Sequence, residues 1–486
     1  MNGRPAKVLC RARQGVRLMN RKNALEAAQR YYGNGSFIGD LSRRIAFATE
    51  SQEFSQRPVL RRYLEDEIGV ALAEIGFSYR LWENPIAEGP PFLFAERSEP
   101  GNSLTVLMYA HGDVVRGDRV NWTEGLDPWK ALVKGDRIYG RGSADNKGQH
   151  TINIGSLAAV IGTRAGKLGF NIKLLMEMGE EVGSPGLADI VELKKQALRA
   201  DLFIASDGPR LSSDKPTLSL GSRGYANFSL SVHSRAKSYH SGNWGGLLSN
   251  PAVILTNALA SIVDSNGAIK VEKLLPPAIP QEVRDTLASI EIRATVDGPA
   301  IATGWGQPGL STAEKLYAWN TFEILAIGCA DAEAPVNAIP RSAIAHCHMR
   351  FVVGTAYQSI ETILREHLDN HGFDGVEIHM ADSSAATRLN PNDPWVDFAV
   401  ASISRSVGRA PVVLPNIGGS IPNDMFAHSL GLPTLWIPHS YAACAQHAPD
   451  EHLLTDIVQE GLRIMAGLWW DLGTFEFTSR TRGVTT

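Results

Sequence analysis

Cysteine is scarce in this sequence, which has four cysteines among 486 residues, at Cys10, Cys329, Cys347 and Cys444. They are far apart and none belongs to a C-x-x-C pair, so their pattern argues against a disulfide framework and against a cysteine-held metal site. We therefore expect reduced thiols in a cytoplasmic protein.

The sequence also lacks a strong charge of either sign and any long apolar run. The formal net charge of −4 gives no reason to expect nucleic acid or an anionic membrane as a partner. No segment approaches the roughly 20 consecutive apolar residues that a membrane-spanning helix needs. Hydrophobic residues at 44% and charged residues at 20% are typical of a soluble globular protein.

Acidic residues are absent from the start of the chain, where seven lysines and arginines precede Glu26. A secretory signal needs an apolar core, and this segment contains none. We expect residues 1–22 to be a disordered tail, or an extension upstream of a natural start at Met19. An organelle transit peptide is the alternative for such a basic segment.

The length of 486 residues exceeds what one ordinary core accommodates, so two domains are expected. Residues 23–216 alternate helical and strand patterns, with apolar strands predicted at residues 104–109, 172–176 and 202–205. Apolar strands that alternate with helices are typical of a doubly wound, mostly parallel α/β sheet. Residues 385–486 return to this pattern, and we assign them to the same catalytic domain.

The intervening residues 217–384 follow a different pattern. Apolar and polar residues alternate in period two at 225–233 and 343–353, as expected of antiparallel strands with one exposed face. A helical pattern follows each of these strands, so the segment predicts a small α+β, ferredoxin-like domain inserted into the first. Residues 274–320 are rich in proline and are expected to be irregular.

The most informative feature of the chain is the point where an apolar strand ends in His111 and Asp113. Side chains two positions apart project from the same side of an extended strand. His111 can therefore bind a metal ion through one ring nitrogen while the other donates to Asp113. A hydrogen-bonded turn without a metal is the plainer interpretation of this motif alone.

Four further segments carry carboxylates or histidine. Asp145 follows a glycine-rich turn, and its two oxygens can bridge two cations. Glu180 and Glu181 are adjacent carboxylates, whose mutual repulsion in a closed site needs cations to offset it. One glutamate of such a pair can bind metal while the other acts as general base toward a water. Asp207 follows a predicted strand, and His447 precedes the last predicted helix.

Each of these segments also has a plainer interpretation, as a helix cap, a turn or an ordinary loop. Taken together, three of the segments follow strands of one predicted sheet, and the segment of His447 lies in the part of the chain assigned to the same domain. They supply histidine and carboxylate donors but no cysteine. This donor set suits zinc or a similar divalent cation. The sequence therefore predicts a two-metal hydrolase site.

This ordered series of motifs resembles the dinuclear-zinc metallopeptidases, a family that includes carnosinase-type dipeptidases, glutamate carboxypeptidase, aminoacylase, acetylornithine deacetylase and succinyl-diaminopimelate desuccinylase. The resemblance implies two zinc ions, with cobalt or manganese as alternatives. It implies that His111 and Asp207 hold one ion, that Glu181 and His447 hold the other, and that Asp145 bridges them.

The same resemblance implies that Glu180 is the general base and that Asp113 orients the first histidine. It also identifies the inserted segment as a lid and dimerisation domain. His240 resembles a histidine that reaches the active site of a neighbouring subunit and polarises the scissile carbonyl. Four residues resemble substrate-binding elements: Asn337, Arg350, Gly419 and Ser420. Among them, the guanidinium of Arg350 and the loop of Gly419 and Ser420 would hold the substrate carboxylate.

We therefore expect a metal-dependent hydrolase of dipeptidase or carboxypeptidase type that forms a homodimer. Its substrate would be a small peptide with a free carboxylate. Deacylation of an N-acyl amino acid, as in the deacetylases and desuccinylases, is the alternative within the same chemistry. Deamination or decarbamoylation at the same site is a third hypothesis. A fourth hypothesis is a non-catalytic homologue that only binds ligand, but the full ligand set together with Glu180 argues against it.

Overall fold

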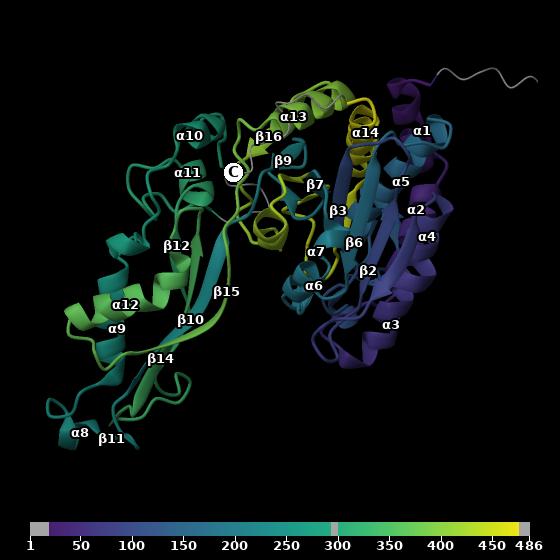
Figure 1. Ribbon diagram of the computed structural model, residues 1–486. Coiled ribbons are helices and arrows are strands. Elements are labelled where there is room, and N and C mark those ends of the chain that lie inside the picture. The colour runs from purple at the N-terminus through teal and green to yellow at the C-terminus, as the bar shows by residue number, and fades with distance from the viewer. Residues whose placement is uncertain (1–18, 293–299, 476–486) are drawn as a thin grey trace, which may run out of the picture.

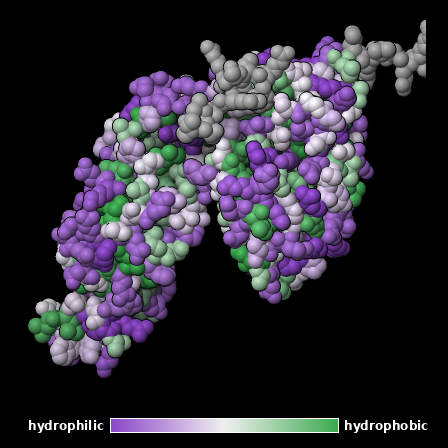
Figure 2. Space-filling view, in the orientation of Figure 1, coloured by the Kyte–Doolittle hydropathy of each residue, from purple (hydrophilic) through white to green (hydrophobic). Residues whose placement is uncertain are grey.

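Two lobes, each built around its own sheet, make up the protein, and a notch separates them (Figure 1, Figure 2). The computed structural model describes residues 19–292 and 300–475. The small lobe is formed by a central stretch of the chain, and segments on both sides of this stretch form the large lobe. The inserted arrangement predicted from the sequence is therefore visible in the path of the chain.

The large lobe is organised by an eight-stranded sheet with the order β1-β2-β6-β3-β7-β17-β9-β16. Its central strands β6, β3, β7 and β17 run parallel, whereas β1 and β2 add an antiparallel edge. This confirms the predicted mostly parallel architecture. The strands are β1 (Ser78–Trp82), β2 (Phe92–Arg97), β3 (Thr105–His111), β6 (Asn171–Glu177), β7 (Leu202–Ala205), β9 (Thr217–Ser219), β16 (Val412–Leu414) and β17 (Thr434–Trp436).

Helices cover both faces of this sheet, because alternate strand residues point to opposite sides. Val106 and Met108 of β3 pack on one face, and Leu107 and Tyr109 pack on the other. The first face carries α1 (Arg21–Gly33), α2 (Ser36–Ala46), α3 (Arg57–Arg62), η2 (Tyr63–Gly69), α4 (Val70–Glu74), α5 (Lys147–Thr163), α13 (Pro394–Val407) and α14 (Thr455–Leu472). The second face carries α6 (Leu187–Leu193), α7 (Lys195–Leu198) and η7 (Met425–Ser429).

The small lobe contains a four-stranded antiparallel sheet with the order β12-β14-β10-β15. Its strands are β10 (Gly224–His233), β12 (Thr321–Gly328), β14 (Ser342–Phe351) and β15 (Glu377–Ser384), and α9 (Pro251–Ile262) and α12 (Ile360–Asn370) pack on one face. The chain order β10, α9, β12, β14, α12, β15 is the βαββαβ order of ferredoxin-like folds. The predicted α+β insertion is confirmed.

The junction between the lobes differs in detail from the sequence expectation. β9 pairs with β16 in the large sheet, so the small sheet begins at Gly224 rather than at residue 217. The segment expected to be irregular contains α10 (Gln281–Leu287) and α11 (Thr312–Tyr317). These two helices share a core cluster with Leu414 of β16, which ties the small lobe to the large one.

Most of the basic N-terminal tail predicted from the sequence lies outside the described residues. Within them, Arg21 already begins α1, and its guanidinium lies 2.9 Å from Asp471 of α14. In the part of the chain that is described, no helix combines the length and the apolar character that spanning a bilayer requires.

Phe203 lies in the core on the second face of the large sheet. It is fully buried and stacks on Phe426 with ring centroids 4.3 Å apart. Phe203→Ala should lower the free energy of unfolding by about 3–5 kcal/mol, because it leaves a cavity among aromatic rings. Phe54→Ala is the control, since Phe54 is 65% exposed. Urea unfolding followed by circular dichroism measures both, and equal midpoints for the two variants would contradict this packing.

Candidate metal centre

The predicted site residues lie at the carboxyl ends of the parallel strands, where ligands bind in open α/β sheets. His111 is the last residue of β3, and Asp207 follows β7 by two positions. Glu180 and Glu181 follow β6 in a short 3-10 turn. Asp145 lies just before α5. The sheet therefore delivers these side chains to one place from segments that are far apart in the sequence.

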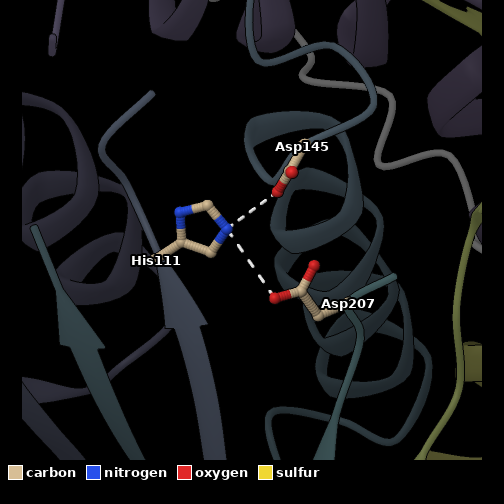
Figure 3. A group of neighbouring side chains, drawn as sticks. All are labelled: His111, Asp145 and Asp207. Atoms are coloured by element: carbon tan, nitrogen blue, oxygen red, sulfur yellow. Dashed lines mark hydrogen bonds and ion pairs between the residues drawn. The ribbon is translucent and has the colours of Figure 1, made fainter. Parts of the chain in front are cut away.

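The first group comprises His111, Asp145 and Asp207 (Figure 3). His111 Nε2 lies 2.9 Å from Asp145 Oδ1 and 3.7 Å from Asp207 Oδ2. All three side chains are buried. One potential ligand atom from each residue lies within 4.8 Å of the other two, which is close enough for one cation to contact all three.

The second group comprises Asp145, Glu181 and His447. His447 Nε2 lies 3.0 Å from Asp145 Oδ2 and 3.0 Å from Glu181 Oε2. Asp145 therefore turns one oxygen toward His111 and the other toward His447. This is the geometry in which a single carboxylate can bridge two cations.

Asp113 holds several residues of the site in position without belonging to either group. His111 Nδ1 lies 3.2 Å from the backbone carbonyl oxygen of Asp113 and 3.4 Å from its Oδ1, so Nε2 of the same ring faces Asp145 and Asp207. The same carboxylate accepts hydrogen bonds from the backbone nitrogens of Glu180 at 3.2 Å and Glu181 at 3.1 Å. Asp113 thus links the end of β3 to the turn after β6.

The site concentrates negative charge in a buried position. Burial, reinforced by the nearby charge of Asp145, raises the pKa of Glu181 to about 7 and that of Asp207 to about 6. Hydrogen bonds with Asp145 and then Glu181 raise the pKa of His447 to about 10. A divalent cation would offset this negative charge, and histidine with carboxylate is a donor set that fits one.

A cavity of about 440 Å³ opens beside the two groups. Glu180 lines it together with Asp145 and His447, and Gly419 and Ser420 line its other side. Burial raises the pKa of Glu180 well above its ordinary value, and the charges of Asp207 and Asp145 add to this effect against the opposing charge of His111.

The predicted substrate-binding residues fall into two places. Arg350 on β14 donates from Nη1 to Ser420 Oγ at 3.1 Å, so the guanidinium reaches the rim of the cavity. His240 lies instead on a small two-stranded ribbon, β11 (Tyr239–His240) with β13 (Ala338–Ile339), and Asn337 directly precedes β13. This ribbon is at the far end of the small lobe (Figure 1), and neither residue lines the cavity.

Glu451 is a residue of the site that sequence reasoning missed, because its position just before the last helix suggested only an exposed helix-end charge. It is 1% exposed. Its Oε1 accepts hydrogen bonds from the backbone nitrogens of Ala144 at 2.9 Å and Asp145 at 3.0 Å. Its Oε2 accepts from the Gly142 nitrogen at 3.1 Å and from Arg141 Nη1 at 2.8 Å. Glu451 therefore holds the loop that presents Asp145.

Two short pairings explain how this contact arises. β19 (His452–Leu454) pairs with β5 (Arg137–Tyr139), which in turn pairs with β4 (Leu132–Lys134). These pairings place the segment that contains His447 and Glu451 next to the loop before α5. Gln446 also donates to Asp145 Oδ2. The alternation of buried and exposed positions is too short in these strands to be recognised from sequence.

Comparison with known proteins identifies the family to which the chain belongs. Residues 107–471 match peptidase family M20/M25/M40, and the chain belongs to this family of metallopeptidases. The match covers both groups and the whole small lobe. The suspected family is thereby confirmed.

The relatives within this class are metallodipeptidases. Human Beta-Ala-His dipeptidase is 26% identical over 397 residues, which cover 79% of this chain and 78% of the relative. The Cys-Gly metallodipeptidase dug1 of Schizosaccharomyces pombe is 26% identical over 458 residues, covering 88% of this chain and 94% of the relative. The expectation of a dipeptidase-like metal-dependent hydrolase agrees with these relatives.

Solved structures support the fold. The M20 family metallo-carboxypeptidase Sso-CP2 from Sulfolobus solfataricus superposes with a TM-score of 0.75 at 23% identity, over 90% of this chain and 99% of that one. The agreement extends across both lobes, so the large lobe with an inserted small lobe is an architecture of the family.

Glu451→Gln should weaken the site by disordering the loop of Asp145. An amide in place of the carboxylate turns an N–H toward backbone donors and leaves the buried Arg141 without its ion pair, at a cost of about 2–4 kcal/mol. Competition with a chromophoric chelator should therefore report weaker uptake of zinc. Asp456→Asn, an exposed change in the first turn of α14, is the control. Equal zinc uptake by the two variants would contradict this role.

Proposed function

We propose that this protein is a dinuclear-metal dipeptidase, which hydrolyses the peptide bond of a small substrate with a free carboxylate. The observation that carries the proposal is the pair of groups that share Asp145 beside a cavity containing Glu180. The relatives named above are dipeptidases, which supports the choice of substrate class.

The proposed ligands follow the geometry of the two groups. His111 and Asp207 hold one cation, Glu181 and His447 hold the other, and Asp145 bridges them. Zinc is our choice of ion because of the histidine and carboxylate donors, with cobalt or manganese as alternatives. Bound cations supply Lewis acidity to the scissile carbonyl and to the attacking water.

In this mechanism Glu180 moves the proton. It takes one from the attacking water and returns it to the leaving nitrogen, so the base must accept and release a proton near neutral pH. Glu180 lines the cavity beside Asp145 and His447, which places its carboxylate next to the two groups. Asp113 fixes the ring of His111 by its contact with Nδ1. Arg350 and the Gly419–Ser420 loop hold the substrate carboxylate at the rim of the cavity.

The proposal also gives the two lobes different roles. Residues 23–223 with 385–486 form the catalytic domain, and residues 224–384 form a lid through which two chains make a homodimer. β12 is an edge strand of the small sheet, and its Leu325 and Ile327 are 64% and 54% exposed. An apolar edge of this kind favours pairing with a second chain. The free cysteines Cys329, Cys347 and Cys444 agree with a cytoplasmic setting.

His240 is proposed to act in the partner subunit. It lies at the end of the small lobe, where an apolar patch is visible (Figure 2). Trp244, Leu247 and Val336 are 43%, 77% and 75% exposed on the same tip. A histidine presented on such a surface is placed to enter another chain, where its ring would polarise the scissile carbonyl. Asn337 directly precedes the paired strand β13 and would contact the same substrate.

Glu180→Gln tests the base. The variant keeps the size of the side chain but cannot accept the proton, so kcat for a dipeptide should fall by about 10²- to 10⁴-fold while metal content stays unchanged. Steady-state hydrolysis and elemental analysis measure the two quantities. Glu192→Gln, an exposed glutamate on α6, serves as control. Retained turnover in Glu180→Gln would rule out this assignment.

Mixing two inactive variants tests the action in trans. In a heterodimer of His240→Ala and Glu180→Gln chains, one of the two sites combines both native residues. Random exchange of subunits should then restore about a quarter of the wild-type rate. Dipeptide hydrolysis after co-refolding or co-expression gives the measurement. A mixture no more active than its separate components would argue that His240 serves its own chain or none.

A further inference from the structure

Glu177 is a buried carboxylate that the mechanism above does not use. It is the last residue of β6, is 1% exposed, and lies opposite His111 of the neighbouring strand β3. Glu180, the proposed base, comes three residues later in the chain. A buried carboxylate is unfavourable without hydrogen bonds, so its partners show which part of the structure it serves.

Both hydrogen bonds of the Glu177 side chain reach the same oxygen. Tyr109 Oη donates to Oε1 at 2.6 Å, and Ser184 Oγ donates to Oε1 at 3.0 Å. Oε2 is buried and has no hydrogen-bond partner among the residues that the structure describes. Glu177 therefore connects a residue of β3 to the residue that ends the turn of Glu180.

Tyr109 gives this connection a fixed end. The residue is 1% exposed, and its ring packs on Phe426 and Trp436, with centroid distances of 5.2 Å and 5.9 Å. Because these rings belong to the core of the large lobe, the hydroxyl of Tyr109 has little freedom to move. It holds Oε1 of Glu177 in one position.

Ser184 gives the connection its other end, at the close of the turn. The backbone nitrogen of Gly183 donates to the Glu180 carbonyl at 2.9 Å, and that of Ser184 donates to the Gly179 carbonyl at 2.8 Å. Ser184 has a φ of 52°, in the left-handed region that favours glycine. The hydrogen bond from its hydroxyl to Glu177 accounts for a serine at a position where the backbone favours glycine.

The turn of Glu180 is thus held on two sides by two different carboxylates. Asp113 accepts hydrogen bonds from the backbone nitrogens of Glu180 and Glu181, at the start of the turn. Glu177 accepts the hydroxyl of Ser184, at its end. Between these two attachments, the side chain of Glu180 reaches the cavity beside the metal centre. Loss of either attachment leaves the turn fixed on one side only.

We propose that Glu177 and Ser184 are positioning residues for the general base, which set the direction of the Glu180 carboxylate through the turn that carries it. This inference rests on the proposed function, because it requires Glu180 to move the proton. Neither residue lines the cavity. Their loss should therefore lower kcat rather than raise KM, since a misplacement of about 1 Å can reduce turnover by about 10²-fold.

Removal of the serine hydroxyl is the first test. Ser184→Ala should lower kcat for a dipeptide by about tenfold, with KM unchanged. Zinc content should also stay unchanged, because Glu181 keeps its contacts with Asp113 and His447. Ser55→Ala, at an exposed serine of the large lobe, is the matched control. Steady-state kinetics and elemental analysis measure these quantities, and a kcat equal to that of the control would overturn the proposal.

Two replacements of Glu177 separate its role as acceptor from its bulk. Glu177→Gln keeps a carbonyl oxygen for both hydroxyls, and its amide nitrogen replaces Oε2, which has no partner among the described residues. Its kcat should stay within about twofold of the wild-type value. Glu177→Met has a similar length but no oxygen, and its kcat should fall by about tenfold. Equal kcat values for the two variants would overturn the proposal.

A double-mutant cycle shows whether Ser184 acts through the base. Ser184→Ala should lower kcat about tenfold in the wild-type background and leave the residual rate of Glu180→Gln unchanged, because no base remains to be positioned. A tenfold loss in both backgrounds would overturn the proposal and leave the base assignment intact. Wild-type turnover by Glu180→Gln itself would overturn the base assignment, and the proposal with it. Chromatographic detection of the released amino acids measures all four rates.

Discussion

The large lobe is built around one electrostatic constraint, which is that Asp145 serves two groups at once. Its Oδ1 faces His111 and its Oδ2 faces His447, and both groups add carboxylates to a buried volume. Such a concentration of like charge is unfavourable unless protons or cations offset it. Burial, and after it the charge of Asp145, raises the pKa of Glu181 and of Asp207.

The surrounding structure resists that repulsion with contacts that are themselves buried. Asp113 spans two strand ends by accepting the backbone nitrogens of Glu180 and Glu181. Glu451 gathers three backbone donors and Arg141 around the loop of Asp145. The oxygens of Asp113 and Glu451 are occupied by these hydrogen bonds. The carboxylates of the two groups that share Asp145 therefore remain available to bind a cation. From the small lobe and its junction, Arg350 donates to Ser420 and Arg223 donates to the Gly418 carbonyl, on the loop that borders the cavity.

The sequence predicts the site where its residues follow the ends of apolar strands. The run at 202–205 was predicted at its observed bounds, and His111 and Asp207 followed directly from the ends of such apolar strands. Glu451 could not be found in this way, because nothing local distinguishes a buried carboxylate from an exposed helix-end charge. The strands that bury it are three residues long, and β9 was missed for the same reason. Short strands depend on their partners in the sheet, and those pairings are long-range.

A crystal structure of the zinc-loaded protein with anomalous scattering data tests the central claim most directly. Two zinc peaks should appear about 3.5–4 Å apart, with one oxygen of Asp145 on each. The histidines should divide between the peaks, His111 on one and His447 on the other. A single peak, or two peaks of which only one touches Asp145, would contradict the account.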